Sequence, residues 1–190
     1  MPINLDPLLI LPADFDDFRD ISKNIDPERL EVYVRESQVK EMRSFLGASL
    51  YLALINDYTA VGDTFSEQRF TDLWFGADWS YQGNTRRFYG LKPAIIYYAY
   101  ARFVRNQQMN VTRYGVKHLT DENSEDETVQ QVRTKVNDAN SYGLLYQADA
   151  ELYLNENVST YPEFEVSETA GEKKTSFKFT KLQPVGYNIY

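Results

Sequence analysis

The chain has 190 residues, a length that suits one domain with its own hydrophobic core. Its hydrophobic fraction of 43% and charged fraction of 25% are ordinary for a globular protein, which argues against disorder of the whole chain. The formal net charge of -8 argues against a free-standing nucleic-acid-binding protein, because such proteins are usually basic. Since the chain has no cysteine, disulfides, thiolate nucleophiles and cysteine-based zinc sites are excluded.

Aromatic residues make up 15% of the chain, with 15 tyrosines and 11 phenylalanines. Tyrosine has a large apolar body and a polar tip, and it is enriched where protein surfaces meet. The composition therefore suits a subunit with several hydrated interfaces. A core rich in tyrosine explains the same composition equally well.

Residues 1–24 are predicted to form an extended N-terminal arm, because Pro7 and Pro12 disfavour helix at the residues before them. No signal peptide is expected, since no basic region precedes the apolar run 8–11 and that run is too short. The most apolar stretch of the chain, 93–101, is far shorter than the roughly 20 residues that span a bilayer.

The first long helix is predicted to begin at Pro27 and to continue to about Tyr58. Asp26 can cap this helix, and proline suits the first helical position because its missing N–H has no partner there. Gly47 is expected to break or bend the helix, and leucines continue an apolar stripe beyond it.

Shorter elements are predicted between residues 59 and 90. A loop over 59–64 is followed by a short helix over 67–75 that Ser66 is expected to cap. Residues 76–90 contain three glycines and several aromatic residues, and they are interpreted as a loop or a small hairpin that turns at Gly83-Asn84.

Two long helices are predicted to form the centre of a bundle. Residues 91–107 are apolar on nearly every side, which is typical of a central helix. After a loop over 110–123, Ser124 and Glu127 form a capping box, and a helix with a heptad seam follows. The seam consists of Val129, Val132, Val136, Ala139, Gly143, Tyr146, Ala150 and Tyr153. Its middle is small, so we expect residues 91–107 to pack closely and antiparallel along it.

Residues 158–190 are predicted to form a small β-hairpin and a C-terminal arm, because two alternating apolar runs flank the turn residues 171–174. Exposed apolar segments usually mark contact sites, so both arms are interpreted as partner-binding elements. The predicted interface residues of the arms are Leu8, Leu9, Phe177, Phe179, Leu182, Tyr187, Ile189 and Tyr190. The alternative is that both arms fold back on their own bundle.

The search for catalytic chemistry gives no candidate residues. His118 is the only histidine, and no nucleophile elbow, HExxH, Walker A or GxGxxG motif is present. The acidic clusters at 14–20 and 121–127 lack the central glycine of a calcium loop, and the preference of acids for helix N-termini explains both. We therefore predict no catalytic residue, no metal and no cofactor, and we expect a protein that is not an enzyme.

Arg86 and Arg87 form the most notable basic pair, next to Phe88 and Tyr89. Two charges are too few for useful affinity to nucleic acid. A salt bridge to an acidic neighbouring subunit is the preferred interpretation, so both arginines join the predicted interface.

Three segments together resemble the head–tail connector (adaptor) proteins of tailed bacteriophages. Phe45–Leu54 resembles the LGxxLYxxL segment that ends the first long helix of that family, and Leu91–Ala101 resembles its central helix of aromatic residues and alanine. Asn110–Val116 resembles its xxTxxGv loop, and the capped helix from Ser124 follows in the expected order. The aromatic-rich style is most similar to the neck ring proteins of crAss-like phages.

The resemblance implies a mainly α fold, a helical bundle of three to four main helices over 25–157. It also implies a virion structural protein that assembles in the host cytoplasm as a homo-oligomeric ring, usually twelvefold, in the neck of the virion. Expected partners are the portal protein and the next neck or tail ring protein, and genomic DNA would pass through without specific binding. The insertion at 76–90 and the chain after 157 depart from the family pattern and leave open which ring this is. The alternatives are another neck or tail-completion protein and, in a different class, a helical ligand-binding bundle.

Overall fold

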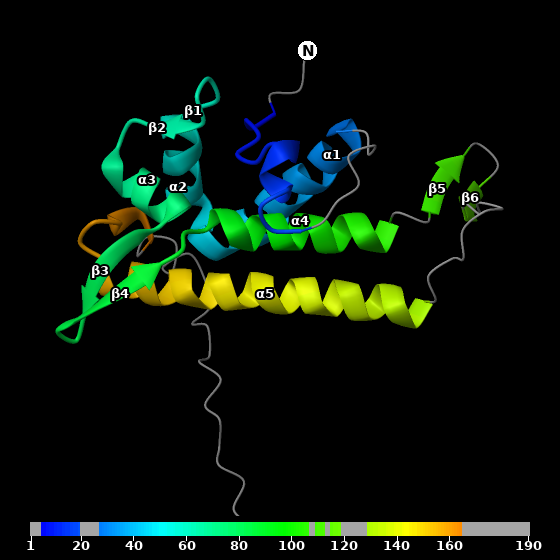
Figure 1. The fold of residues 1–190 in the computed structure, drawn as a ribbon. Coiled ribbons are helices and arrows are strands. Elements are labelled where there is room, and N and C mark those ends of the chain that lie inside the picture. The colour runs from blue at the N-terminus through cyan, green and yellow to red at the C-terminus, as the bar shows by residue number, and fades with distance from the viewer. Residues whose placement is uncertain (1–4, 20–26, 107–108, 113–114, 119–128, 165–190) are drawn as a thin grey trace, which may run out of the picture.

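The computed structural model describes residues 5–19, 27–106, 109–112, 115–118 and 129–164. These residues are mainly helical, as the sequence predicted, and they include three antiparallel strand pairs (Figure 1). The helical elements are η1 (Pro12–Phe15), α1 (Pro27–Ser37), η2 (Gln38–Met42), α2 (Arg43–Asp57), α3 (Gln68–Phe75), α4 (Lys92–Asn106) and α5 (Val129–Glu156). The strands are β1 (Tyr58–Thr59), β2 (Thr64–Phe65), β3 (Ala77–Tyr81), β4 (Asn84–Phe88), β5 (Met109–Thr112) and β6 (Gly115–His118).

The helix α4 lies at the centre of the fold, and α5 runs antiparallel along it (Figure 1). Most side chains of α4 are buried, which agrees with the apolar character of this helix on nearly every side. The heptad seam faces α4 over most of α5, although Val129 at its start is 83% exposed. At Gly143 the two helices approach closely, since a Cβ built there would lie 2.7 Å from Cε1 of Tyr98.

The segment predicted as one long helix consists of three parts. The helix α1 continues into a π-helical turn, η2, and then into α2. Gly47 interrupts α2 with φ 77° and ψ 164°, a conformation that glycine adopts without the strain a Cβ causes. The predicted break at Gly47 is therefore confirmed, whereas the π turn at 38–42 was not predicted.

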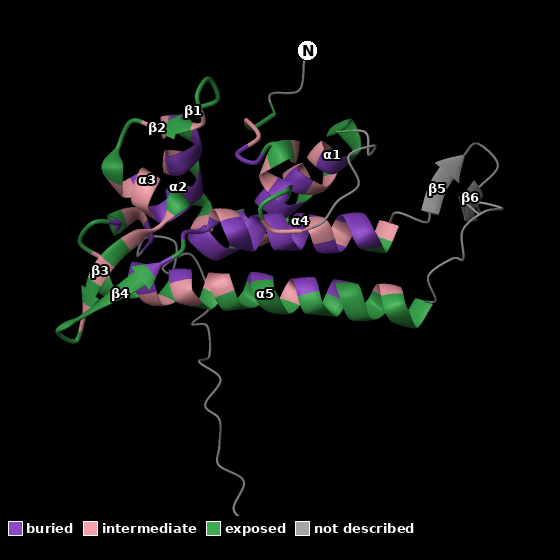
Figure 2. Cartoon of the chain, in the orientation of Figure 1, coloured by how far each residue is buried: buried purple, intermediate pink, exposed green. Residues whose placement is uncertain are grey.

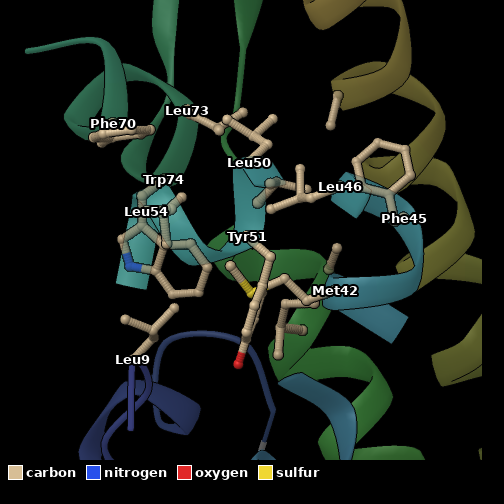
Figure 3. Close-up of a cluster of buried hydrophobic side chains, with 14 of the residues drawn as sticks. Leu9, Met42, Phe45, Leu46, Leu50, Tyr51, Leu54, Phe70, Leu73 and Trp74 are labelled. Atoms are coloured by element: carbon tan, nitrogen blue, oxygen red, sulfur yellow. The ribbon is translucent and has the colours of Figure 1, made fainter. Parts of the chain in front are cut away.

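The core consists of two hydrophobic clusters. The larger cluster joins α2, α3, β4, the first half of α4 and the last part of α5, and Figure 3 shows its centre around Leu50, Leu54 and Trp74. The smaller cluster joins α1 to the other ends of α4 and α5. Its buried residues are Leu30, Tyr97, Ala101, Phe103, Val104, Val136 and Ala139. Figure 2 shows this burial concentrated in α4 and along one side of α5.

The described part of the N-terminal arm lies on the core of the chain itself. Leu9 and Ile10 are fully buried in the larger cluster, and Leu8 packs against it. The buried Gln38 accepts a hydrogen bond from the Leu9 N–H and donates one to the Pro7 carbonyl, each 3.0 Å long. The Gln38 side chain thus provides hydrogen-bond partners for the Leu9 N–H and the Pro7 carbonyl, so the extended segment can be buried without leaving these two backbone groups unpaired. Leu9, predicted as an interface residue, is therefore buried in the core of its own chain, and residues 5–19 follow the alternative of folding back.

Two charged contacts fix the same N-terminal segment. Lys92 of α4 lies 2.9 Å from Asp14 and 2.9 Å from Asp63, so it joins η1 to the turn between β1 and β2. Burial lowers the pKa of Lys92, but hydrogen bonds to the two carboxylates raise it more, and the net direction is upward. The Tyr51 hydroxyl donates to Asp6 at 2.8 Å, and burial together with this carboxylate raises the pKa of Tyr51 to about 12.

The hairpins meet the predictions to different degrees. Strands β3 and β4 pair in register from Ala77–Phe88 to Tyr81–Asn84, so of the two alternatives for 76–90 the hairpin holds, with its turn at Gln82-Gly83, one residue before the predicted Gly83-Asn84. Strands β5 and β6 form a second hairpin inside the segment predicted as a loop. Ser66 is not the cap of α3, because the N-cap position is Glu67. The Glu67 N–H is instead satisfied by the carboxylate of Asp57 at 2.9 Å.

Candidate interaction surfaces

The predicted interface residues are only partly within the described structure. Phe177, Phe179, Leu182, Tyr187, Ile189 and Tyr190 lie outside the described residues, as do the capping box at 124–127 and most of the predicted C-terminal hairpin. His118 ends strand β6. Leu8 and Leu9, by contrast, are within the described residues, and they lie against and in the core.

Arg86 and Arg87 are consecutive exposed residues of β4, in the β3–β4 hairpin that Figure 1 shows at one end of the fold. Arg87 pairs with Asp78 across the hairpin, with Nε 2.8 Å from Oδ1 and Nη2 3.1 Å from Oδ2. These hydrogen bonds lower the pKa of the Asp78 carboxyl. Arg87 thus has an ion-pair partner within its own chain, and its guanidinium does not need the predicted salt bridge to a neighbouring subunit.

Arg86 contacts other groups of the chain. Its guanidinium lies 5.2 Å from the ring centroid of Tyr81, a cation–π distance. Burial raises the pKa of Asp149 on α5, and the positive charge of Arg86 opposes that rise. The hairpin is therefore linked electrostatically to the C-terminal half of α5.

Four tyrosines form a row on the joint surface of α4, α5 and the chain after β4, which we name the tyrosine row: Tyr89, Tyr97, Tyr142 and Tyr146. The ring of Tyr97 stacks on Tyr142 at 5.2 Å and on Tyr146 at 5.8 Å. Tyr89 is 58% exposed and Tyr142 is 43% exposed, whereas Tyr97 is buried. The row therefore supplies core at one edge, in agreement with the interpretation as a tyrosine-rich core, and an amphipathic surface at the other, where the interface interpretation stays a prediction.

Arg19 lies over the tyrosine row at the end of the N-terminal segment. Its guanidinium carbon lies 5.1 Å from the ring centroid of Tyr97 and 5.5 Å from that of Tyr142. The same group forms a 2.7 Å ion pair with Asp138 of α5. Sequence reasoning missed this contact, because nothing in the pattern around Arg19 shows which rings lie 80 or 120 residues later.

A polar pocket of about 180 Å³ opens between η2, α4 and α5. Its lining residues are Lys40, Glu41, Tyr98, Ala101, Arg102, Arg105 and Asn140. Arg102 donates to Glu41 and lies 3.5 Å from Glu36, whereas Glu41 Oε2 is buried without a hydrogen-bond partner among the described residues. Burial and the charge of Glu41 raise the pKa of Tyr98 to about 12. The pocket thus combines several cations with one carboxylate, an arrangement that can bind small polar molecules.

Acidic side chains do not gather into a metal site within the described residues. Asp14, from the first acidic cluster, accepts a 2.7 Å hydrogen bond from the Leu11 N–H at the start of η1. That position agrees with the predicted role of these acids at a helix N-terminus. Within the described part of the chain, no helix combines the length and hydropathy needed to cross a membrane.

Comparison with known proteins gives one family. No curated protein and no solved structure matches this chain. The model of DUF6712, a family of unknown function, matches residues 42–174, which is more than half of the chain and extends from the start of α2 beyond the end of α5. On that coverage, the protein belongs to the DUF6712 family.

Proposed function

We propose that this protein is a virion structural protein, a subunit of the head–tail connector ring that joins the portal to the tail. The observation that carries the proposal is that the segments resembling the connector family pack together in one hydrophobic core. Phe45–Leu54 of α2 and Leu91–Ala101 of α4 both contribute to the larger cluster, and α5 packs along α4 in the expected order. Residues separated by about 50 positions thus build a common helical unit.

In the assembled state we propose a bundle of three to four main helices, with a β-hairpin and an extended C-terminal arm within 158–190. The ring would be twelvefold and would contact the portal and the next neck or tail protein. The net charge of -8 supports a wall for the DNA passage, because acidic surfaces keep a polyanion from adhering. Another neck or tail-completion protein would share these features, and imaging of the particle would distinguish the two positions.

The experiment is light scattering coupled to size-exclusion chromatography on the full chain, followed by electron microscopy of the main peak. A closed ring with a central opening is the expected result. A monomer at every concentration up to the highest soluble one would refute the connector assignment.

The polar pocket favours a second candidate, a helical bundle that binds a small ligand. Lys40 and Arg105 have no ion pair among the described residues, and they line the pocket together with Arg102. A library of small anions and amino acids can be tested by thermal shift on the full chain. A ligand that raises the melting temperature of the wild type but not of Arg105→Ala would favour this candidate over the ring.

A further inference from the structure

The helix α5 has an exposed side without charged residues, opposite the side that packs on α4. At 100° per residue, this outer face of α5 comprises one stripe of eight positions. The residues of the outer face are Thr134, Asn137, Ser141, Leu144, Leu145, Ala148, Leu152 and Asn155. All are exposed except the half-buried Leu152, and Figure 2 shows the exposed surface along the side of α5 away from α4.

This composition is unusual for a solvent-exposed helix face in a chain with 25% charged residues. Leu144 is 60% exposed and Leu145 is 62% exposed, and they lie midway along the outer face on its two edges, since consecutive helical residues are about 100° apart. Depletion of charge together with exposed apolar side chains is typical of the centre of a protein–protein interface. Residues 138–156 contain no lysine or arginine; Asp138 pairs with Arg19, and the remaining charged residues, Asp149, Glu151 and Glu156, are all acidic.

The segment 173–190 of the same sequence has the complementary chemistry. It contains Lys173, Lys174, Lys178 and Lys181 and no acidic residue. Between and after these lysines lie the large apolar side chains Phe177, Phe179, Leu182, Tyr187, Ile189 and Tyr190. An uncharged stripe with exposed leucines flanked by acids and an apolar segment that carries lysines complement each other in hydrophobicity and charge.

The position of the last described residues shows what this segment can reach. Tyr161 donates to the Arg69 carbonyl at 2.7 Å, and the ring of Phe164 lies 6.3 Å from that of Phe45, so the chain is anchored beside the larger cluster up to residue 164. The twelve residues between Phe164 and Phe177 span up to about 40 Å when extended. That distance is about the length of α5 itself, so the segment can extend to an adjacent subunit.

We propose that the outer face of α5 is the docking surface for segment 173–190 of a neighbouring copy of this chain. The inference rests on the proposed ring, because the ring supplies an adjacent copy within reach of that segment. Leu144 and Leu145 are the central contacts, and the acids flanking them pair with the lysines of the incoming segment. Each subunit then both presents an outer face and donates a segment, which suits a head-to-tail ring.

The absence of cysteine allows a direct test in the full chain. Leu145→Cys and Ile189→Cys are made in separate, differently tagged copies, co-expressed and treated with a short bis-maleimide reagent. The expected product is a cross-linked pair that carries both tags. Val61→Cys in place of Leu145→Cys is the control, because Val61 is 89% exposed on the β1–β2 turn and should give no such product. A variant that carries Leu145→Cys and Ile189→Cys in the same chain tests the alternative. If this variant cross-links within one chain and the separate copies do not cross-link to each other, the segment docks on its own copy and the inference is overturned.

A second measurement tests the energetic coupling of the two parts. Leu145→Lys should weaken assembly about tenfold in light scattering, and deletion of Gln183–Tyr190 should do the same, while each subunit keeps its melting temperature. The combined variant should be no weaker than either change alone, because both remove the same contact. Fully additive losses would overturn the inference. If rings form without the cross-link, only this inference fails; if the chain is a monomer, the connector assignment fails as well.

Discussion

Gly76 and Gly90 lie back to back where α3 ends and where the chain leaves β4. A Cβ built on Gly90 would lie 2.3 Å from the Trp74 carbonyl oxygen, and one built on Gly76 would lie 2.3 Å from the Phe88 carbonyl oxygen. Both residues also have positive φ, 100° at Gly76 and 82° at Gly90. Two independent constraints, backbone conformation and close approach of backbone atoms, therefore require glycine at both positions.

The first prediction separates these two constraints. Gly83 has a similar φ of 79° but has no atom within 4 Å of an added Cβ, so Gly83→Ala should cost only the conformational strain, about 1 kcal/mol. Gly90→Ala should cost about 3 kcal/mol or more, because backbone atoms of α3 must also move. Urea unfolding of both variants measures the difference. Equal decreases in the free energy of unfolding would show that the close approach of backbone atoms at Gly90 does not contribute to stability.

The second prediction concerns the contact between Gly143 and Tyr98. The Tyr98 ring is buried and its hydroxyl donates to Gln147 at 2.8 Å, so it cannot swing away without losing that bond. Gly143→Leu should therefore overpack the α4–α5 contact and lower the free energy of unfolding by about 1–3 kcal/mol. Asn137→Leu is the control, because this exposed position should change stability by less than about 0.5 kcal/mol. A tolerated Gly143→Leu would contradict the close packing of the two helices.

At the scale of elements, Arg69 ties the chain after α5 to α3. Its Nη1 and Nη2 donate to the two carboxylate oxygens of Glu163 at 2.8 and 3.0 Å, and Nη1 also reaches the Thr160 carbonyl at 3.2 Å. The hydrogen bonds from Arg69 hold the pKa of Glu163 below its usual value of 4.5, although partial burial acts in the opposite direction. Residues 157–164 are thereby fixed to a helix more than 80 positions earlier in the chain.

The third prediction follows from the sign of that pKa shift. A carboxyl whose pKa is lowered on folding stabilises the folded state above its unfolded pKa, and the stabilisation is lost as pH falls through the lower folded value. Glu163→Gln should thus destabilise the protein at pH 7, and its difference from wild type should shrink below about pH 4.5. Urea unfolding at pH 7 and pH 3.5 gives both values. In an Arg69→Met background the same substitution should have little effect, and an unchanged effect there would exclude the pair as its cause.

Several elements were predictable because local patterns determine them. The all-round apolarity of α4 and the small heptad seam of α5 predicted where the two helices lie, and the glycine at 83 predicted the β3–β4 turn. The β5–β6 hairpin was missed, although two short runs with β-branched residues flank the two residues 113 and 114, a spacing that favours a hairpin.

Long-range contacts were the part that local patterns could not predict. Gln38 is a polar residue in a helical stretch, and only the folded chain shows that it binds the backbone of residues 7 and 9. Similarly, Asp78 and Arg87 are nine positions apart, and the pairing register of the hairpin had to be known before their contact could be inferred. The candidate surfaces depend on such contacts. The sequence therefore indicated which residue types could form a surface, but it did not indicate which of these residues contact one another.

At the scale of the whole molecule, net charge determines the sequence-independent affinity of the protein for DNA. With a net charge of -8, the subunit should not accumulate a polyanion, since sequence-independent affinity comes from neutralising phosphates. The fourth prediction is that labelled duplex DNA shows no change in fluorescence anisotropy with the full chain between 50 and 200 mM salt. Tight binding that weakens steeply with salt would contradict a non-adhesive wall.

The uneven distribution of tryptophan gives the molecule a built-in optical reporter for one end. Trp74 of α3 and Trp79 of β3 are the only tryptophans, and both belong to or pack against the larger cluster, whereas the aromatic residues of the smaller cluster are tyrosine and phenylalanine. Emission excited near 295 nm, where tyrosine absorbs little, will therefore follow the disruption of the larger cluster. Far-UV circular dichroism sums over every helix, so the separation of the two melting curves measures how independently the opposite ends of α4 and α5 come apart.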